Sequence, residues 1–186
     1  LAGEWMALRF FANEKGKLIE ATSKTTLSNN EGMWRSLIAT DIDNDGDEDL
    51  FVTNSFSGKK RLLNFFYLNN GDGSFTKNTS DVIATDTAWS YGCAFGDYDN
   101  DGFQDLAVAT CRFNKTDDVD LLYHNNGNGN HWITIKLIGT KSNKAAIGAK
   151  VYVKATIDGK SISQLREVSS QNGYCSQNDL RVHVGL

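Results

Sequence analysis

The chain has 186 residues, a formal net charge of −4, 40% hydrophobic residues and 23% charged residues. This length corresponds to one domain or two small ones, and the composition is close to that of ordinary globular proteins. No stretch approaches the ~20 apolar residues of a membrane span, so we expect no membrane insertion. Because the chain opens with neither Met nor a basic and apolar leader, we expect it to be a processed or excised piece.

The acidity is concentrated in two short windows. Residues 41–49 hold six acidic residues and no basic one, and residues 97–105 hold four acidic residues and no basic one. A division at residue 130 gives a net charge of −9 for residues 1–129 and +5 for residues 130–186. This pattern excludes the diffuse acidity of a disordered tail and predicts two acidic sites beside a basic C-terminal part.

Two sequence markers recur with the same period of 56 residues. The acidic windows begin at Asp41 and Asp97. A run containing aromatic residues, followed by Asn and a Gly turn, places its Asn at Asn13, Asn69 and Asn125. A shared period in two independent markers indicates an internal repeat of about the length of a propeller blade, although stacked β-arrays are an alternative.

Each period contains four predicted strands, because apolar and aromatic residues alternate between Gly and Asn turns. The predicted strands are 6–12, 17–22, 33–40 and 49–55 in the first period, and 62–68, 74–78, 88–96 and 105–111 in the second. No segment shows sustained helical periodicity. We therefore predict an all-β fold with two or more four-stranded blades of the propeller type.

The pattern changes after residue 129. Residues 131–140 alternate as a strand, residues 146–168 read as two strands around an Asp-Gly turn, and residues 181–186 form a last short strand. We therefore divide the chain into repeats over residues 1–129 and a small β-module over residues 130–186.

Both acidic windows, DIDNDGDED and DYDNDGFQD, fit the pattern D-x-D-x-D-G-x-x-D. Carboxylates at alternate positions let one turn of chain point several oxygen ligands inward, which suits a hard cation, and Gly46 or Gly102 permits the sharp reversal. We predict two Ca²⁺ sites with side-chain ligands at every aspartate of the pattern and one backbone carbonyl each. The first set is Asp41, Asp43, Asp45, Asp49 and the carbonyl of Asp47; the second is Asp97, Asp99, Asp101, Asp105 and the carbonyl of Phe103.

The acidic windows fit three other structures less well. An EF-hand needs Glu at the twelfth position, which holds Val52 and Val108 here within strand-like segments. Mg²⁺ is less suited because it prefers octahedral geometry and keeps several waters. A solvated acidic turn remains the alternative for a single copy, but two copies in register favour a metal site.

The two windows and their flanks, IATDIDNDGDEDLFV and AFGDYDNDGFQDLAV, resemble FG-GAP/VCBS-type repeats, and YLNNGDGSF is similar to the VCBS type. The stretches HWITIKLIGTKSNKAAIGAKV, REVSSQNGYCSQNDLR and HVGL resemble the ASPIC/UnbV domain that follows such repeats in cartilage-acidic-protein-like proteins. The resemblance implies a calcium-bearing β-propeller and a secreted or cell-surface protein. Because 186 residues hold only two full periods, we expect a fragment of a larger propeller or a chain that completes its sheets with other subunits.

Three further features bear on the compartment. Calcium loops of this kind stay filled where calcium is millimolar, outside cells. Cys93 and Cys111 flank the second loop and either form a cross-strand disulfide or pack as small apolar residues, as we expect for Cys175. Asn78 and Asn114 begin N-glycosylation sequons, which matter only for a glycoprotein of a eukaryotic secretory pathway.

No motif of hydrolases, zinc proteases or nucleotide-binding enzymes occurs in the sequence, so we expect no catalysis. His124 and His131 are either a minor metal site or solvated turn residues. The positive charge of residues 130–186 is either a solvated face or a surface that meets anions or the acidic repeats of a neighbour; its lysines are Lys136, Lys141, Lys144, Lys150, Lys154 and Lys160. Nucleic acid is a weak candidate, because the chain has no strong basic stripe with stacking aromatic residues.

We therefore predict an extracellular, calcium-stabilised module for cell adhesion or for binding protein or glycan at the cell surface or matrix. One alternative is a self-associating subunit of an extracellular fibre or matrix, assembled through blade edges and charge complementarity. Another is a fragment of a polysaccharide-active propeller enzyme.

Overall fold

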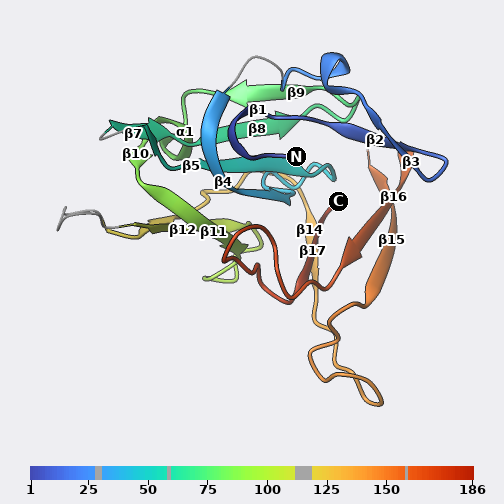
Figure 1. The fold of residues 1–186 in the computed structure, drawn as a ribbon. Helices are drawn as coiled ribbons and strands as arrows, with labels where there is room; N and C mark the ends of the chain where they lie inside the picture. The colour runs from blue at the N-terminus through green and yellow to red at the C-terminus, as the bar shows by residue number, and fades with distance from the viewer. Residues whose placement is uncertain (28–30, 58–59, 112–118, 158) are drawn as a thin grey trace.

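The computed structural model describes residues 1–27, 31–57, 60–111, 119–157 and 159–186. Short strands joined by turns make up most of this part of the chain, so the predicted β-protein is confirmed (Figure 1). The helical segments among these residues are two single turns, η1 (Thr22–Lys24) and α1 (Val82–Thr85). None of the described helices is long and apolar enough to cross a membrane.

The first acidic window lies in a five-stranded antiparallel sheet with the order β1-β4-β5-β8-β9. The strands are β1 (Glu4–Ala7), β4 (Glu31–Thr40), β5 (Asp49–Asn54), β8 (Phe65–Asn69) and β9 (Phe75–Asn78). β4 and β5 enclose the acidic loop, with Thr40 opposite Asp49, and β8 and β9 enclose a Gly turn. Apart from β1, this is a four-stranded antiparallel sheet built from two hairpins, as expected for a propeller-type blade.

The sheet combines the acidic hairpin with the Gly-turn hairpin that follows it in the chain. The prediction grouped the acidic hairpin with the preceding one, which is instead a separate two-stranded ribbon of β2 (Phe11–Glu14) and β3 (Lys17–Glu20). A period of 56 residues does not say at which turn one sheet ends and the next begins. The pairing of β8 along the edge of β5 decides it here, with Val52 opposite Phe65.

The second period repeats this arrangement with one strand fewer. A three-stranded sheet joins β11 (Ser90–Gly96), β12 (Asp105–Thr110) and β13 (Leu121–Tyr123), and β14 (Trp132–Ile135) follows β13 as β9 follows β8. However, β14 pairs with β17 (Val182–Gly185) and not with β13. The strand that would complete the second sheet therefore belongs to the C-terminal module.

The remaining strands are short or form ribbons. A three-stranded sheet has the order β10-β7-β6 and contains β6 (Phe56–Ser57), β7 (Lys60–Leu63) and β10 (Thr87–Ala88). In the C-terminal module, β15 (Lys150–Ile157) and β16 (Lys160–Glu167) form a hairpin (Figure 1). The predicted strand 6–12 divides into β1 and β2, because the chain turns between them, where Arg9 N–H bonds the Leu1 carbonyl and Phe10 N–H bonds Thr22 Oγ1. The predicted strand 62–68 likewise divides at buried Asn64, which accepts the N–H of Asn54.

Three apolar clusters hold these sheets together. The first lies between the two repeat sheets, where Phe51 and Phe95 meet edge to face with ring centroids 6.2 Å apart. The second covers the opposite face of the first sheet and includes Trp34, Val52 and Tyr67. Strand alternation explains the division, because the neighbours Phe51 and Val52 point to opposite faces. The third cluster is the core of the C-terminal module and centres on buried residues of β17.

Of the two alternatives for Cys93 and Cys111, the structure does not form the disulfide. Cys93 lies opposite Val108, and the N–H of Cys111 bonds the carbonyl of Trp89. Both cysteines are free, as is Cys175. Symmetry about the loop centre would have placed the two cysteines opposite each other, but the true register is displaced from it and carries a β-bulge between Ser90 and Cys93. Cys93 packs as a small apolar residue in the first cluster.

Candidate metal centre

The first acidic loop, residues 41–48, turns its alternate carboxylates toward one point. Asp41, Asp43 and Asp45 each contribute an oxygen, and these atoms lie within 4.8 Å of one another. The turn is held by backbone donors, since Gly46 N–H bonds Asp41 Oδ2 at 3.1 Å and Asp47 N–H bonds Asp45 Oδ1 at 2.9 Å. The left-handed backbone of Gly46, with φ of 97°, makes the reversal that the sequence predicts.

The second loop, residues 97–104, reproduces this geometry. Asp97, Asp99 and Asp101 form the equivalent group of oxygens within 4.8 Å. Gly102 N–H bonds Asp97 Oδ2 at 3.1 Å, and Phe103 N–H bonds Asp101 Oδ1 at 2.9 Å. The two copies therefore agree in side-chain placement as well as in sequence.

The aspartate at the ninth position of each acidic window, Asp49 or Asp105, lies at the end of the loop, where the next strand begins. Both are buried, at 2% exposure, and each accepts two backbone N–H groups. Asp49 bonds Ile42 N–H at 3.0 Å and Asn69 N–H at 2.8 Å. Asp105 bonds the equivalent Tyr98 N–H at 3.1 Å and Asn125 N–H at 2.9 Å. Neither joins its loop's group of three carboxylates, but both oxygens of Asp49 and Oδ2 of Asp105 keep a second lone pair with which they can accept a cation.

The recurrent Asn of the repeat has a structural role that the sequence did not reveal. Its Oδ1 accepts the N–H of the next Gly turn, at 2.8 Å from Asn13, 3.1 Å from Asn69 and 3.0 Å from Asn125. In the two complete copies its Nδ2 also bonds the carbonyl of the residue before the ninth aspartate, Glu48 or Gln104. The Asn therefore ties the Gly turn of one hairpin to the acidic loop of its neighbour.

The electrostatics of the first loop favour a bound cation. Asp41 is 1% exposed, and its Oδ1 is buried without a hydrogen-bond partner. Burial raises the pKa of the Asp41 carboxyl to about 7, and the charges of Asp45 and Asp43 act in the same direction. Burial also raises the pKa of Asp49 to about 7. An unpaired buried carboxylate oxygen beside two further carboxylates is costly without a cation, and its oxygen-only surroundings suit Ca²⁺.

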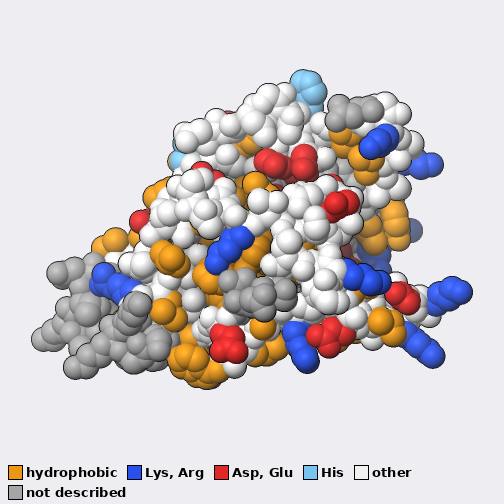
Figure 2. Space-filling model, turned by 90° about the horizontal axis from the view of Figure 1, so that it is seen from above, with side chains coloured by type: hydrophobic (Ala, Val, Ile, Leu, Met, Phe, Trp, Pro, Cys, Tyr) orange, Lys and Arg blue, Asp and Glu red, His pale blue; other side chains and the backbone are white. Residues whose placement is uncertain are grey.

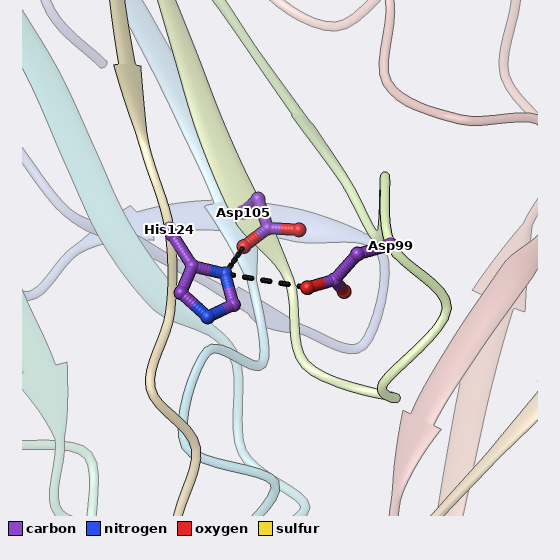
Figure 3. A group of neighbouring side chains, drawn as sticks. All are labelled: Asp99, Asp105 and His124. Carbon is purple, nitrogen blue, oxygen red and sulfur yellow. Dashed lines mark hydrogen bonds and ion pairs between the residues drawn. The ribbon is translucent and has the colours of Figure 1, made fainter.

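His124 lies beside the second loop, as Figure 3 shows. Its Nδ1 is 3.2 Å from Asp105 Oδ1 and 3.6 Å from Asp99 Oδ2. His124 directly precedes Asn125, the recurrent Asn of the repeat, whose N–H bonds Asp105. This place in the sequence was the signal that could have located His124 beside the second loop. His131 belongs to none of the metal-ligand groups found among the described residues, so the suggested pairing of the two histidines is not seen.

The two loops touch each other and the C-terminal module. Asn44 Nδ2 donates to the carbonyl of Gly102 at 3.0 Å, which joins the first loop to the second. Gly185 N–H donates to Asp41 Oδ2 at 3.0 Å, although the two residues are 144 positions apart. Neither contact could be predicted from the sequence, because each depends on how separate elements pack.

One of the two predicted glycosylation sites, Asn78, lies among the described residues. Asn78 is partly exposed, and its Oδ1 accepts the N–H groups of Ser80 at 3.0 Å and Asp81 at 3.1 Å. Asn114 lies outside the described residues.

Comparison with known protein families found matches to two parts of the chain. Residues 41–108 match the family model of the FG-GAP-like repeat, and residues 139–186 match the model named ASPIC and UnbV. No curated protein and no solved structure matched the chain. The first match contains both acidic loops, and the second contains β15, β16 and β17.

Proposed function

Because the chain carries an FG-GAP-like repeat followed by an ASPIC/UnbV domain, we propose that it is a calcium-stabilised, non-catalytic interaction module that works outside the cell. These domains are typical of a propeller-type binding module. The observation that carries the calcium part is the duplicated loop, in which three carboxylates converge at the same positions in both copies.

Calcium would act here as a structural ion. Asp41, Asp43 and Asp45 would hold it in the first loop, and Asp97, Asp99 and Asp101 in the second, with Asp49, Asp105 and the carbonyls of Asp47 and Phe103 as the remaining predicted ligands. Bound calcium supplies positive charge that offsets the repulsion between these carboxylates. The surrounding hairpins would then be rigid enough to present a binding surface.

The absence of catalysis is part of the proposal. The first loop offers little access to a substrate, because Asp41 and Asn44 are each 1% exposed and lie beneath the C-terminal strand. The second loop is more exposed, but its carboxylates converge in the same arrangement as those of the first loop. The expected partner is a protein or glycan of the cell surface or matrix, bound by the sheets around the loops.

The proposal of an extracellular location is supported by the affinity range of calcium loops in extracellular modules. Oxygen-only loops of extracellular modules bind calcium with dissociation constants of about 10⁻⁴–10⁻³ M, so they are filled where calcium is millimolar. The secreted character of proteins with similar domains supports the same location.

Assembly into a fibre or matrix is the second candidate. It is favoured by strands that lie at the edge of a sheet. Among the described strands, β13 pairs only with β12 and β3 pairs only with β2, so each has one edge without a partner strand. Leu18 on β3 is 71% exposed and Ile19 is 44% exposed. The six lysines of residues 130–186 are exposed and make no ion pair within the described part of the chain. On the face seen in Figure 2, basic side chains are spread singly and form no single patch. Attraction between these basic side chains of one copy and acidic side chains of another would therefore be spread over that face and not concentrated in one patch.

Calorimetric titration of the full chain with CaCl₂ tests the proposal. We expect two bound ions, and one fewer in each of the matched variants Asp41→Asn and Asp97→Asn. Asp72→Asn is the control, because Asp72 is an exposed aspartate of a turn outside both loops. An unmodified chain without calcium uptake would overturn the calcium part.

The interaction part needs a separate assay. We expect immobilised full chain to retain glycans or matrix proteins in calcium and to release them in EGTA. Light scattering across a concentration series distinguishes the two candidates, since a discrete monomer in calcium contradicts the fibre. Depolymerisation of a polysaccharide by the purified chain would contradict a non-catalytic role.

A further inference from the structure

The end of the chain crosses both acidic loops. We call residues 181–185, which include strand β17, the C-terminal strap. Figure 1 shows the C-terminal module beside the repeat sheets, with β14 and β17 near the loops at their edge. The strap makes polar contacts with both loops, whereas Asn130 and Arg166 of the module contact the first loop, at Asp43 and Glu48.

The contacts with the first loop are close and buried. Gly185 N–H donates to Asp41 Oδ2 at 3.0 Å, and His183 Nε2 lies 2.6 Å from Asn44 Oδ1. A Cβ on Gly185 would lie 2.3 Å from Asp41 Oδ2 and 2.6 Å from the Cα of Asn44. Only a residue without a side chain therefore fits at position 185 while the loop keeps this shape.

In the second loop the strap again contacts the residue at the fourth position. The Arg181 guanidinium donates to Asn100 Oδ1 at 2.7 Å and to the Asp97 carbonyl at 2.7 Å. Asn44 and Asn100 are both the fourth residue of their loops, and both have left-handed backbone, with φ of 58° and 62°. The strap thus contacts the fourth residue of each loop, with side chains two positions apart.

The strap is also fixed firmly to its own module. β17 pairs along its length with β14, and Val182 and Val184 lie in the module's apolar core. Gln164 Nε2, from β16, donates to the Gly185 carbonyl at 2.8 Å. A shift of the loops would therefore have to move the whole module or break the strap away from them.

We propose that the C-terminal strap is a calcium-coupled latch, which docks on the calcium-ordered shape of the loops and in turn favours that shape. The proposal rests on the calcium binding proposed above. Without a cation, the converging carboxylates of each loop repel one another, which disfavours the arrangement in which Asn44 Oδ1 and Asp41 Oδ2 face the strap. Linkage requires the reverse effect too, so the docked strap raises the affinity of the first loop for calcium.

The two loops should then differ although their sequences agree. Asp41 and Asn44 of the first loop are buried beside the strap, whereas Asp99, Asn100 and Asp101 of the second loop are exposed. Coupling is therefore expected mainly at the first site, with calcium at the second exchanging more freely with solvent.

Gly185→Ala is the test, and Gly129→Ala is its matched control. The backbone of neither glycine lies in the left-handed region, but a Cβ on Gly129 meets nothing within 4 Å. In calorimetric titrations of the full chain with CaCl₂, we expect Gly185→Ala to weaken one of the two sites by about tenfold or more, within the usual range of couplings. The other site, and both sites of Gly129→Ala, should keep their affinities.

A second readout does not depend on the variant. Hydrogen exchange of the unmodified chain, followed on a peptide that covers residues 180–186, should become faster when EGTA removes calcium. If Gly185→Ala fails to fold, His183→Phe keeps a ring of similar size, removes the contact with Asn44, and should weaken the same site.

The possible failures are distinguishable. A chain that takes up no calcium overturns the proposed function itself. If the chain binds two calcium ions but the strap variants keep their calcium affinity, the latch alone is overturned. The same holds if hydrogen exchange in the strap does not change when EGTA is added.

Discussion

The side chain of Asn44, in the first acidic loop, donates a hydrogen bond of 3.0 Å to the carbonyl of Gly102 in the second. Asn44 is 1% exposed and also has its Oδ1 against His183. One buried carboxamide therefore contacts both the second repeat and the C-terminal module. Its equivalent in the second loop, Asn100, is exposed and contacts only Arg181 among the described side chains.

The first prediction concerns this pair. Asn44→Ala should lower the free energy of unfolding by roughly 2–4 kcal/mol, because it leaves buried partners unsatisfied and places Ala in a left-handed conformation. Asn100→Ala bears the same backbone cost but loses an exposed contact, so it should cost only about 1–2 kcal/mol. Urea unfolding in calcium measures both, and equal losses would contradict the central role of Asn44.

The second prediction concerns pH and calcium. In the calcium-free protein the pKa of Asp41 and of Asp49 is raised from 3.8 to about 7, chiefly by burial. The folded state therefore holds protons between pH 7 and pH 4 that the unfolded state does not, so its stability rises as the pH falls through this range. Burial lowers the pKa of His183 from 6.5 to about 4, which opposes the effect below pH 6.5. With two aspartates against one histidine, we expect a net gain in the unfolding free energy from pH 7 to pH 5.

Calcium must displace these protons. At pH 6 its uptake should release protons, and its affinity should fall as the pH is lowered. Calorimetry in two buffers with different ionisation enthalpies measures the release, and Asp41→Asn should release fewer protons than the unmodified chain. Uptake at pH 6 without proton release would show that the carboxyls are already ionised.

The third prediction concerns the cysteines. Burial raises the pKa of the Cys93 thiol to about 12, whereas Cys175 is exposed. A thiol reagent should label Cys175 in the native protein and reach Cys93 only after unfolding, because the thiolate is the reactive form. Cys175→Ser should remove the fast phase. Peptide mapping under non-reducing conditions that finds Cys93 joined to Cys111 would contradict the strand register described above.

The fourth prediction concerns the glycines of the loops. A Cβ on Gly102 would lie 1.6 Å from Cε2 of Trp132, inside the indole ring, whereas a Cβ on Gly46 would meet its nearest atoms at 3.1 Å. Gly73 has a similar left-handed backbone, with φ of 87°, and open space around it. We expect losses of about 1 kcal/mol for Gly73→Ala, from backbone conformation alone, and roughly 3 kcal/mol or more for Gly102→Ala.

A double-mutant cycle identifies the cause of the larger loss. Trp132→Ala should recover part of the stability that Gly102→Ala loses, because it removes the ring that the new methyl group meets. Strictly additive losses would place the origin of the effect in the backbone and not in the indole.

Local patterns in the sequence were enough to predict the acidic hairpins. The spacing of Asp41, Asp43 and Asp45 and the Gly at position 46 act within one turn of chain, so the convergence of the carboxylates follows from the sequence alone. The repeat was equally readable, because Asn13, Asn69 and Asn125 each perform the same task at a Gly turn. The strands beside the loops were predicted to within about two residues. The resemblance to FG-GAP-like repeats rested on the acidic windows, and the resemblance to ASPIC/UnbV rested on other stretches within residues 131–186.

Pairing between distant segments was decided only in the tertiary structure. Backbone hydrogen bonding is the same for any strand, so the sequence could not say that β8 pairs with β5 or that β14 leaves the second sheet for β17. The hairpin register placed Cys93 opposite Val108 and not opposite Cys111, without any mark in the residue types. The contact of Gly185 with Asp41 spans 144 positions and depends on the packing of a whole module. The sequence by itself determined the two acidic loops, because their chemistry is local; their burial, their contact with each other and the strap across them were determined by the packing of the sheets.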